Sequence, residues 1–282
     1  MKSIQEKAGT LVEALPYLQK FAGETLVIKY GGHAMTNAES AQSFARDLAL
    51  LQSIGLKVVV VHGGGPQIGS MLNDLGIESQ FVNGYRMTDE PTMSVVRMVL
   101  VGKVNQDIVS RINGQGGRAI GLSGADGLLL KGHQVSVDGQ DVGRVGIIDT
   151  VDVDQLNFLA SGGYMPIIAP VAVDADGSPL NVNADLAAGV IAGHLGARKL
   201  LLMTDVEGVL NADGAVISTL KRQEISTLIQ DGTLTGGMLP KLKCAQDALH
   251  EGVRKVHIVD GRIQHAVLLE LFTDEGIGTE VI

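Results

Sequence analysis

Two glycine turns, each directly after an apolar segment, constrain the fold of this chain most strongly. Residues 25–30 read Thr-Leu-Val-Ile-Lys-Tyr and stop at Gly31-Gly32, and residues 58–62 stop at Gly63-Gly64-Gly65-Pro66. β-Branched, apolar segments that end abruptly at turn residues are typical of buried strands in a parallel sheet. Glycines at such ends let a ligand approach backbone N–H donors, and proline favours a helix start. The two turns therefore predict a site for an anion, such as a phosphoryl group or a carboxylate.

Most of the chain alternates between short apolar segments and longer amphipathic ones. Parallel βαβ units of this kind carry helices on both faces, so we expect an α/β fold: a three-layer αβα sandwich with a mainly parallel central sheet. The expected strands are residues 25–30, 57–62, 118–122, 164–169, 199–204 and 255–259. The expected helices are residues 37–54, 66–75, 91–112, 184–195, 238–251 and 263–271. Between residues 126 and 182, Asp-Gly pairs separate short alternating segments, which predicts hairpins added to the parallel sheet.

Residues 1–22 precede the first expected strand and carry apolar residues at helical spacing. They predict an amphipathic N-terminal helix that Pro16 kinks or splits in two. Its apolar face packs either on the chain's own sheet or on another subunit, and we favour an oligomerisation helix. The remainder is expected to form two lobes of one continuous sheet, with a boundary near residue 196.

Composition argues against several classes of function. The net charge is −9 and lysines and arginines do not cluster, which argues against a nucleic-acid partner. The single cysteine excludes an internal disulfide and fits a reducing cytoplasm. The seven histidines lack zinc-like spacing, and no apolar segment approaches the ~20 residues that span a bilayer. We expect a cytoplasmic protein without a membrane segment, a signal peptide or a metal site of its own.

Other anion-binding and catalytic motifs fit less well. Nothing matches the P-loop pattern GxxxxGK[ST], and Gly63-x-Gly65 followed by Gly69 is one residue too long for a dinucleotide fingerprint. The His62-Gly-Gly-Gly65 segment also resembles an esterase oxyanion loop, and residues 121–125 a defective nucleophile elbow. A hydrolase is therefore an alternative, although no triad histidine is evident.

Charged residues near the glycine turns are candidates for the site. Lys29 interrupts the end of a buried strand, and burying an unpaired ammonium is costly, so it needs an anion or a carboxylate beside it. Asp185, at a helix start, is the candidate carboxylate, although an acid there is also a common cap. Arg86 lies in a polar loop, and Lys241 follows a glycine pair and begins a helix.

Taken in order, these segments resemble the amino-acid kinase superfamily, and most closely its N-acetyl-L-glutamate kinase family. The resemblance runs from Lys29 to the C-terminus, and it rests on Ile28-Lys29-Tyr30-Gly31-Gly32, His62-Gly63-Gly64-Gly65-Pro66, Arg86-Met-Thr-Asp89, Asn181-Val-Asn-Ala-Asp185, Thr204-Asp-Val-Glu-Gly-Val209 and Gly236-Gly237-Met-Leu-Pro-Lys241. It implies ATP-dependent phosphorylation of the side-chain carboxylate of N-acetyl-L-glutamate, the second step of arginine biosynthesis. It also implies Mg²⁺ held by the nucleotide phosphates.

The resemblance implies a role for each matching residue. Lys29 and Lys241 would stabilise the transferring phosphoryl group, and Asp185 would orient the two lysines. Substrate binding is implied for Gly64, Gly65, Arg86 and Asn181. Nucleotide binding is implied for Gly31, Gly32, Thr204, Asp205, Val206, Glu207, Gly208, Val209, Thr233, Gly236 and Gly237. The lobe at 23–196 would then bind the acyl amino acid, and the lobe at 197–282 the nucleotide.

A carboxylate acceptor explains why the candidate site lacks a general base. A glutamate-like carboxyl has a pKa of roughly 4.3 and is already ionised at neutral pH. Phosphoryl transfer then depends on positioning and charge stabilisation, which cations and N–H donors supply. A sibling kinase acting on acetylaminoadipate, aspartate, glutamate or a carbamate is a second alternative, and a non-catalytic arginine-sensing module is a third.

Arginine-inhibited members of the family carry an extra N-terminal helix and a distinct C-terminal segment. Residues 1–22 and 265–279 resemble these two segments. The resemblance implies a homohexamer, a trimer of dimers joined through the N-terminal helices, with L-arginine as feedback inhibitor. The candidate arginine-site residues are Tyr17, Lys221, Glu275 and Gly278. A nitrogen-signalling protein is a further candidate partner.

Overall fold

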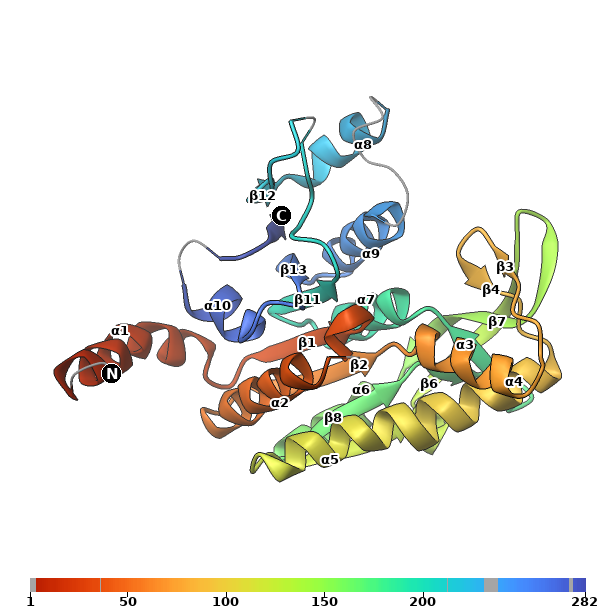
Figure 1. The fold of residues 1–282 in the computed structure, drawn as a ribbon, viewed down its shortest axis with the longest axis horizontal. Helices are drawn as coiled ribbons and strands as arrows, with labels where there is room; N and C mark the ends of the chain where they lie inside the picture. Colours follow the sequence, from red (N-terminus) through yellow and green to blue (C-terminus); the bar gives the residue numbers. More distant parts are fainter. Residues whose placement is uncertain (1–3, 36, 212, 231–237, 274–275) are drawn as a thin grey trace.

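The structure, a computed structural model, describes residues 4–35, 37–211, 213–230, 238–273 and 276–282 and confirms the expected α/β class (Figure 1). Within these residues an eight-stranded sheet has the order β12-β14-β13-β11-β1-β2-β8-β5. Neighbouring strands run parallel except β13 and β14, which are antiparallel. The strands are β1 (Thr25–Tyr30), β2 (Lys57–His62), β5 (Ala119–Ser123), β8 (Met165–Ala169), β11 (Lys199–Thr204), β12 (Thr219–Leu220), β13 (Lys255–Asp260) and β14 (Thr279–Val281).

Helices cover both faces of this sheet and complete the predicted three layers. The first face carries α1 (Ile4–Phe21), α2 (Ala38–Ser53), α3 (Gly65–Asp74), the continuous run α4 (Glu90–Arg97), η2 (Met98–Asn105) and α5 (Gln106–Gly114), and α10 (Ala266–Phe272). The second face carries α6 (Val153–Ser161), α7 (Ala184–His194), α8 (Arg222–Gln230) and α9 (Met238–His250). Short 3₁₀ helices lie at η1 (Gly32–Met35) and η3 (Asp126–Leu128). Helices α6 and α8 were not expected from the sequence.

Side chains of the central strands alternate between two separate apolar cores. Leu26 and Ile28 of β1 lie in the core of the first face, and Val27 lies in the core of the second face. Because side chains of a strand alternate with a period of two, Lys29 belongs to the second face. This places its ammonium on the side of α7 and α9.

The hairpins predicted between residues 126 and 182 form, but they do not extend the main sheet. β6 (Leu130–Val137) and β7 (Gln140–Val151) pair across the Asp138-Gly139 turn, and with β9 (Val171–Val173) and β10 (Pro179–Val182) they close into a small barrel. This corrects the expectation. β7 is long enough to pair with both β6 and β10, so the barrel strands satisfy one another's backbone groups instead of adding to a sheet edge.

The barrel also holds the loop that contains Arg86. That loop is a short hairpin of β3 (Phe81–Val82) and β4 (Tyr85–Arg86). After it, Thr88 N–H donates to Val142 O at 2.9 Å and Arg144 N–H donates to Thr88 O at 2.6 Å. These two backbone bonds fix the end of the loop against β7, beside Asn181 of β10.

The N-terminal helix is continuous and extends away from the body (Figure 1). Pro16 lies inside it, so of the two expected effects of this proline, a kink or a split, the split into two helices does not occur. Its C-terminal part contacts α10, because the rings of Tyr17 and Phe21 lie 6.4 and 6.2 Å from the ring of Phe272. Val12 is 68% exposed and Leu15 48%, so these apolar side chains are not covered by the chain itself.

The expected two lobes share one sheet, because β11 and β13 belong to the same sheet as β1 and β2. The division into lobes at residue 196 stays a prediction. In the part of the chain that the structure describes, no helix is both long enough and apolar enough to cross a membrane.

Candidate active site

The carboxyl ends of parallel strands meet at one edge of the sheet, and the predicted charged residues gather there. Lys29 near the end of β1 lies with its Nζ 3.0 Å from Oδ1 of Asp185, at the start of α7. Lys241, in the first turn of α9, lies with its Nζ 2.7 Å from Oδ2 of the same carboxylate. The structure thus brings together these three side chains from distant parts of the sequence, bridged by one carboxylate.

This cluster is buried and carries a net positive charge. The side chains of Lys29, Asp185 and Lys241 are 11%, 11% and 16% exposed. Burial by itself would raise the pKa of Asp185, but the two ammonium groups outweigh it and lower the pKa to about 2. The carboxylate is therefore ionised at neutral pH and neutralises one of the two lysines. The remaining positive charge makes the edge attractive to an anion.

Local contacts hold the carboxylate in place. Asn183 caps α7, and its Oδ1 accepts from the N–H groups of Asp185 and Leu186 at 2.9 and 3.3 Å. The buried thiol of Cys244 donates to the backbone carbonyl of Asp185 at 2.9 Å. This contact was not predicted from the sequence, although Cys244 follows Lys241 by three residues and so shares its helix face.

A cavity of about 150 Å³ opens beside the charged cluster, lined by both glycine turns. A Cβ at Gly31 would lie 2.7 Å from Lys29 Nζ, and a Cβ at Gly32, where φ is +70°, would overlap the Asp205 carboxylate. A Cβ at Gly64 would lie 2.5 Å from Cδ2 of Leu100. These three positions therefore lack room for a side chain, and the turns leave bare backbone along the cavity.

A second cavity of about 190 Å³ adjoins the first and shares Gly63, Gly64, Gly65, Asn183 and Ala184 with it. It has an apolar wall of Ile68, Phe81, Leu100, Val145, Pro170 and Val182, and it has polar groups from Arg86 and Asn181. The combination fits a small ligand with both an apolar group and an anionic group.

Arg86 and Asn181 of the second cavity are both held by neighbours. Arg86 is buried, its Nη2 donates to Gly65 O at 3.0 Å, and its Nη1 donates to the hydroxyl of Ser79. Its guanidinium lies 4.6 Å from the centre of the Phe81 ring. Burial lowers the pKa of Arg86 from its usual value. The amide of Asn181 donates to Oγ1 of Thr88 at 3.1 Å.

The segment predicted to bind a nucleotide follows β11 at the same edge. Thr204 ends β11, and Asp205 lies against Gly32. Val206 is 42% exposed and Glu207 is exposed, whereas Val209 is fully buried and its N–H donates to the hydroxyl of Thr279 at 2.8 Å. A Cβ at Gly208 would meet that same hydroxyl at 2.7 Å. The other predicted nucleotide residues, Thr233, Gly236 and Gly237, lie outside the described residues.

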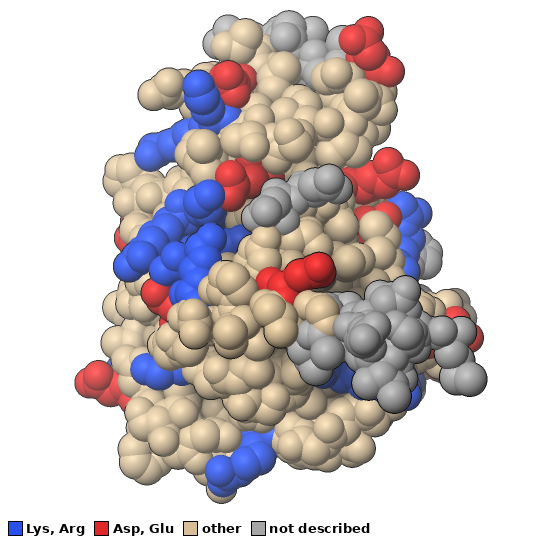
Figure 2. All heavy atoms as spheres, turned by 90° about the vertical axis from the view of Figure 1, so that its left-hand side faces the viewer, with Lys and Arg blue, Asp and Glu red and all other residues tan. Residues whose placement is uncertain are grey.

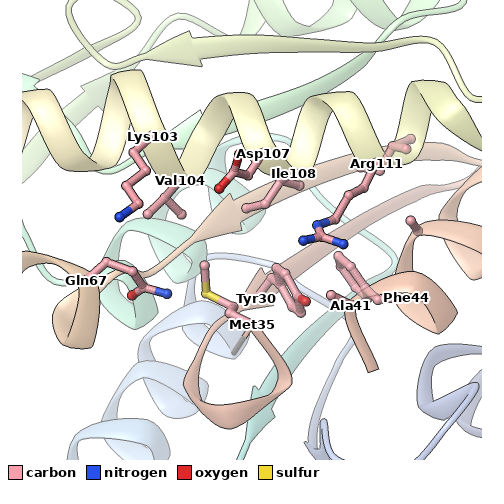
Figure 3. A pocket seen from close by; sticks show the side chains of 12 residues that line it. Tyr30, Met35, Ala41, Phe44, Gln67, Lys103, Val104, Asp107, Ile108 and Arg111 are labelled. Atoms are coloured by element: carbon pink, nitrogen blue, oxygen red, sulfur yellow. The ribbon is translucent and has the colours of Figure 1, made fainter. Parts of the chain in front are cut away.

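A third cavity, of about 60 Å³, lies behind β1 on the opposite face from the ion pairs (Figure 3). Tyr30 and Phe44 stack there with ring centres 3.9 Å apart, and Arg111 points toward them from α5. Met35 and Gln67 line both this cavity and the one beside the charged cluster. The two cavities therefore adjoin at Met35 and Gln67, and the third cavity also has charged residues in its wall, Lys103, Asp107 and Arg111.

A larger hollow of about 540 Å³ lies at the opposite end of the sheet strands, between α1 and α10. Basic side chains gather on this side of the molecule (Figure 2), and the hollow is lined by Lys20, Arg198, Lys199, Arg254 and Lys255. Burial lowers the pKa of Lys199 to about 8, against the opposing effect of Glu270 and Glu280. Nδ1 of the buried His257 lies against Oε1 of the buried Glu270. This convergence could not be predicted from the sequence, since the residues come from separate segments.

Two of the predicted arginine-site residues line this hollow. Tyr17 and Gly278 line it, whereas Lys221 is not among its lining residues. Glu275 lies outside the described residues.

The hydrolase alternative finds no support in the described residues. Ser123 is 6% exposed at the end of β5, where its N–H donates to Asp126 Oδ2 at 2.7 Å. His62 is fully buried, and its Nε2 faces the amide of Asn105 at 3.1 Å. Its ring nitrogens bond to that amide and to a backbone carbonyl, so this histidine cannot serve as the base of a serine nucleophile. Among the described residues, no three His, Cys, Asp or Glu side chains converge to hold a metal ion.

The ion pairs of Asp185 predict a specific dependence of stability on pH. A carboxyl whose pKa is lower in the folded state stabilises the fold above its unfolded pKa, and this contribution is lost as pH falls through the folded value. The lowered pKa of Asp185 corresponds to about 2 kcal/mol. We therefore expect the free energy of unfolding of the unaltered chain to fall relative to that of Asp185→Asn between pH 5 and pH 2, measured by urea titration. Parallel curves for the two proteins would contradict the assignment.

Comparison with known proteins shows the family to which this chain belongs. The amino acid kinase family model matches residues 24–260. The acetylglutamate kinase of Syntrophobacter fumaroxidans is 55% identical over 287 residues, which cover 98% of this chain and 96% of that protein. The N-acetylglutamate synthase of Neisseria gonorrhoeae, complexed with coenzyme A and N-acetyl-glutamate, superposes with a TM-score of 0.88 at 26% identity over 99% of this chain. The same synthase complexed with coenzyme A and L-arginine gives 0.83 at 26% identity, also over 99% of this chain.

The synthase and the kinase differ in how much of their length this chain matches. This chain spans 63% and 65% of the two synthase chains, but nearly all of the kinase. The family model and the full-length relative support one assignment, which the sequence motifs predicted. The chain belongs to the amino acid kinase family, among the acetylglutamate kinases, and it is a kinase.

Proposed function

We propose that this kinase transfers the γ-phosphoryl group of ATP to the side-chain carboxylate of N-acetyl-L-glutamate, giving N-acetyl-L-glutamyl 5-phosphate and ADP. The observation that carries the proposal is the carboxylate of Asp185 held between Lys29 and Lys241, at the edge shared by two cavities. The name of the kinase from Syntrophobacter fumaroxidans supports the same acceptor. The reaction would be the second step of arginine biosynthesis.

The proposed chemistry needs no proton transfer. A carboxylate oxygen of the substrate attacks the γ-phosphorus, the new O–P bond forms, and the P–O bond to ADP breaks. The main obstacle is the repulsion between an anionic nucleophile and the triphosphate. Lys29 and Lys241 offset that charge, while the N–H groups of Gly64 and Gly65 donate to the transferring group. Mg²⁺ bound to the nucleotide phosphates would supply further neutralisation.

The substrate would lie in the cavity that contains Arg86 and Asn181. A guanidinium matches the α-carboxylate of the acyl amino acid with two parallel hydrogen bonds, and the apolar wall suits the acetyl methyl group. Its side-chain carboxylate would then face the shared glycine turn. The nucleotide would lie on the other side of that turn, along Gly31, Gly32 and residues 204–209, with residues 233–237 as a further predicted contact.

The two lysines provide the first test. Replacing Lys29 or Lys241 by alanine should lower kcat by about 10²–10³, as removing one charge-stabilising donor does elsewhere. Lys243→Ala is the matched control, because this lysine is exposed on the same helix α9. The assay is ATP-dependent trapping of acyl phosphates by hydroxylamine, with acetylglutamate, acetylaminoadipate, aspartate and glutamate as separate acceptors. Losses below tenfold would contradict the role of the lysines, and a preference for another acceptor would favour a sibling kinase.

Arg86 provides a test of substrate binding. Arg86→Lys keeps the charge but replaces a planar fork by a point charge, so we expect KM for acetylglutamate to rise about tenfold or more while KM for ATP changes little. Arg97→Lys, at an exposed position of α4, is the control. An unchanged KM for acetylglutamate would show that the guanidinium does not bind the substrate.

We propose in addition that L-arginine inhibits the enzyme and that the chain assembles as a homohexamer through α1. The exposed Val12 and Leu15 support an interface on α1, and the hollow between α1 and α10 combines carboxylates and cations that suit a zwitterionic amino acid. The synthase structure with L-arginine provides a related precedent. A cytoplasmic location and a nitrogen-signalling partner belong to the same proposal.

Charged substitutions on the apolar face of α1 should disrupt the hexamer without unfolding the subunit. The double variant Val12→Glu, Leu15→Glu introduces repulsion where helices would meet, so we expect dimers by light scattering and loss of arginine inhibition, with basal activity retained. Leu75→Glu is the matched control, because Leu75 is 54% exposed elsewhere on the surface. A double variant that stays hexameric would exclude the proposed interface.

A further inference from the structure

A buried histidine at the end of β2 contacts the glycine turn of the site. The side chain of His62 is fully buried and belongs to the face of the sheet opposite Lys29, since Val58 and Val60 of the same strand lie in the core of the first face. Its Nδ1 lies 2.9 Å from the carbonyl oxygen of Gly63, and its Nε2 lies 3.1 Å from Nδ2 of Asn105. This imidazole has no part in the proposed chemistry.

Asn105 determines which nitrogen of the imidazole carries the proton. Its buried Nδ2 also lies 2.8 Å from the carbonyl oxygen of Ile167 and 3.4 Å from that of Leu122. A nitrogen that faces two carbonyl oxygens is a donor, so His62 Nε2 accepts from it. The proton of the neutral ring is then on Nδ1 and is donated to the carbonyl of Gly63. Burial lowers the pKa of His62 to about 4, which agrees with a neutral ring at physiological pH.

The acceptor of this bond belongs to a peptide that matters for the reaction. The carbonyl of Gly63 and the N–H of Gly64 are part of one planar trans peptide, in which the two groups point in opposite directions. A carbonyl held toward the buried imidazole therefore directs the Gly64 N–H away from the core. Gly64 lines both cavities, so this N–H is directed to the side of the turn where the phosphoryl group would be transferred.

The glycine turn needs such a restraint because glycine rotates freely about its backbone bonds. The preceding peptide is fixed by the bond from Gly63 N–H to Tyr30 O at 2.8 Å. Leu100 and Val104 of η2 occupy the space that a Cβ at Gly64 would need, and Asn105 is the last residue of the same segment. This segment is π-helical, a geometry frequent at functional sites. It therefore supports the turn both through packing and through the imidazole.

We infer that His62 and Asn105 are positioning residues for phosphoryl transfer, which fix the Gly63–Gly64 peptide through a neutral imidazole. The inference rests on the proposed function for its effect on catalysis, but the orientation of the peptide does not depend on the acceptor. Neither side chain touches the substrate, so their effect is confined to the step in which Gly64 N–H meets the transferring group.

The experiment compares two replacements of His62 in the full chain. In His62→Asn the amide nitrogen occupies approximately the place of Nδ1 and retains a donor for Gly63 O, whereas His62→Leu has none. We expect His62→Leu to lower kcat by about 10²–10³, with KM for ATP and acetylglutamate within about threefold, and His62→Asn to recover most of that loss. Asn105→Leu should lower kcat by about tenfold. Asn113→Leu is the matched control and should leave kcat unchanged, because it removes a similar amide link between α5 and β5, away from the turn.

Two further measurements separate positioning from folding and from the choice of substrate. Thermal unfolding identifies destabilised variants, and crystal structures of both variants show the orientation of the Gly63–Gly64 peptide. A rotated peptide in His62→Leu and a native orientation in His62→Asn would support the inference. If the unaltered enzyme failed to phosphorylate acetylglutamate, only the proposed function would be overturned. A native peptide in a folded His62→Leu, or equal losses of kcat in both variants when both remain folded, would overturn the inference.

Discussion

The geometry of the site depends on one carboxylate that binds two ammonium groups. Asp185 joins the end of β1 to the starts of α7 and α9 through Lys29 and Lys241. Burying three charges costs desolvation energy, and such a cluster adds little stability compared with apolar packing. The arrangement is better explained by function. One carboxylate cannot neutralise two lysines, so the edge retains a positive charge at a fixed position. In the proposed reaction, the phosphoryl group would meet cations that are already oriented.

Because side chains alternate along the central strands, the charged groups of the site lie on one face of the sheet and His62 lies on the other. β1 and β2 are paired in register, with Lys29 opposite Val61 and Tyr30 opposite His62. Lys29 therefore faces α7 and α9, which supply charge, while His62 faces the π-helical segment, which supplies rigidity. A shift of either strand by one residue would exchange the two faces and bury the ammonium in the apolar core of the first face. The register thus couples the electrostatics of the site to its backbone geometry.

The sequence predicted the features that depend on local pattern. The spacing of apolar residues predicted the central strands and the long helices to within a few residues. Glycine turns beside Lys29 and Lys241 indicated a candidate site, and the structure brings these two lysines together at Asp185. Features that depend on contacts between distant segments were either not predicted or predicted wrongly. The closure of the barrel follows from the pairing of β7 with two partners, and the hollow between α1 and α10 assembles residues as far apart as Lys20 and Glu280. The continuity of α1 through Pro16 shows that a single lost hydrogen bond need not end a helix.

The role of His62 illustrates why a motif needs its structural context. Beside three glycines, a histidine matches both an esterase loop and a phosphate-binding turn, and the two differ only in where the imidazole points. Here it is buried against Asn105, so it does not reach the reacting atoms. A carboxylate nucleophile requires no base, and the histidine is therefore free to act on the backbone instead. The proposed reaction includes no proton transfer, so charge stabilisation would be the main contribution of the protein. The orientation of the N–H donors would then be decisive.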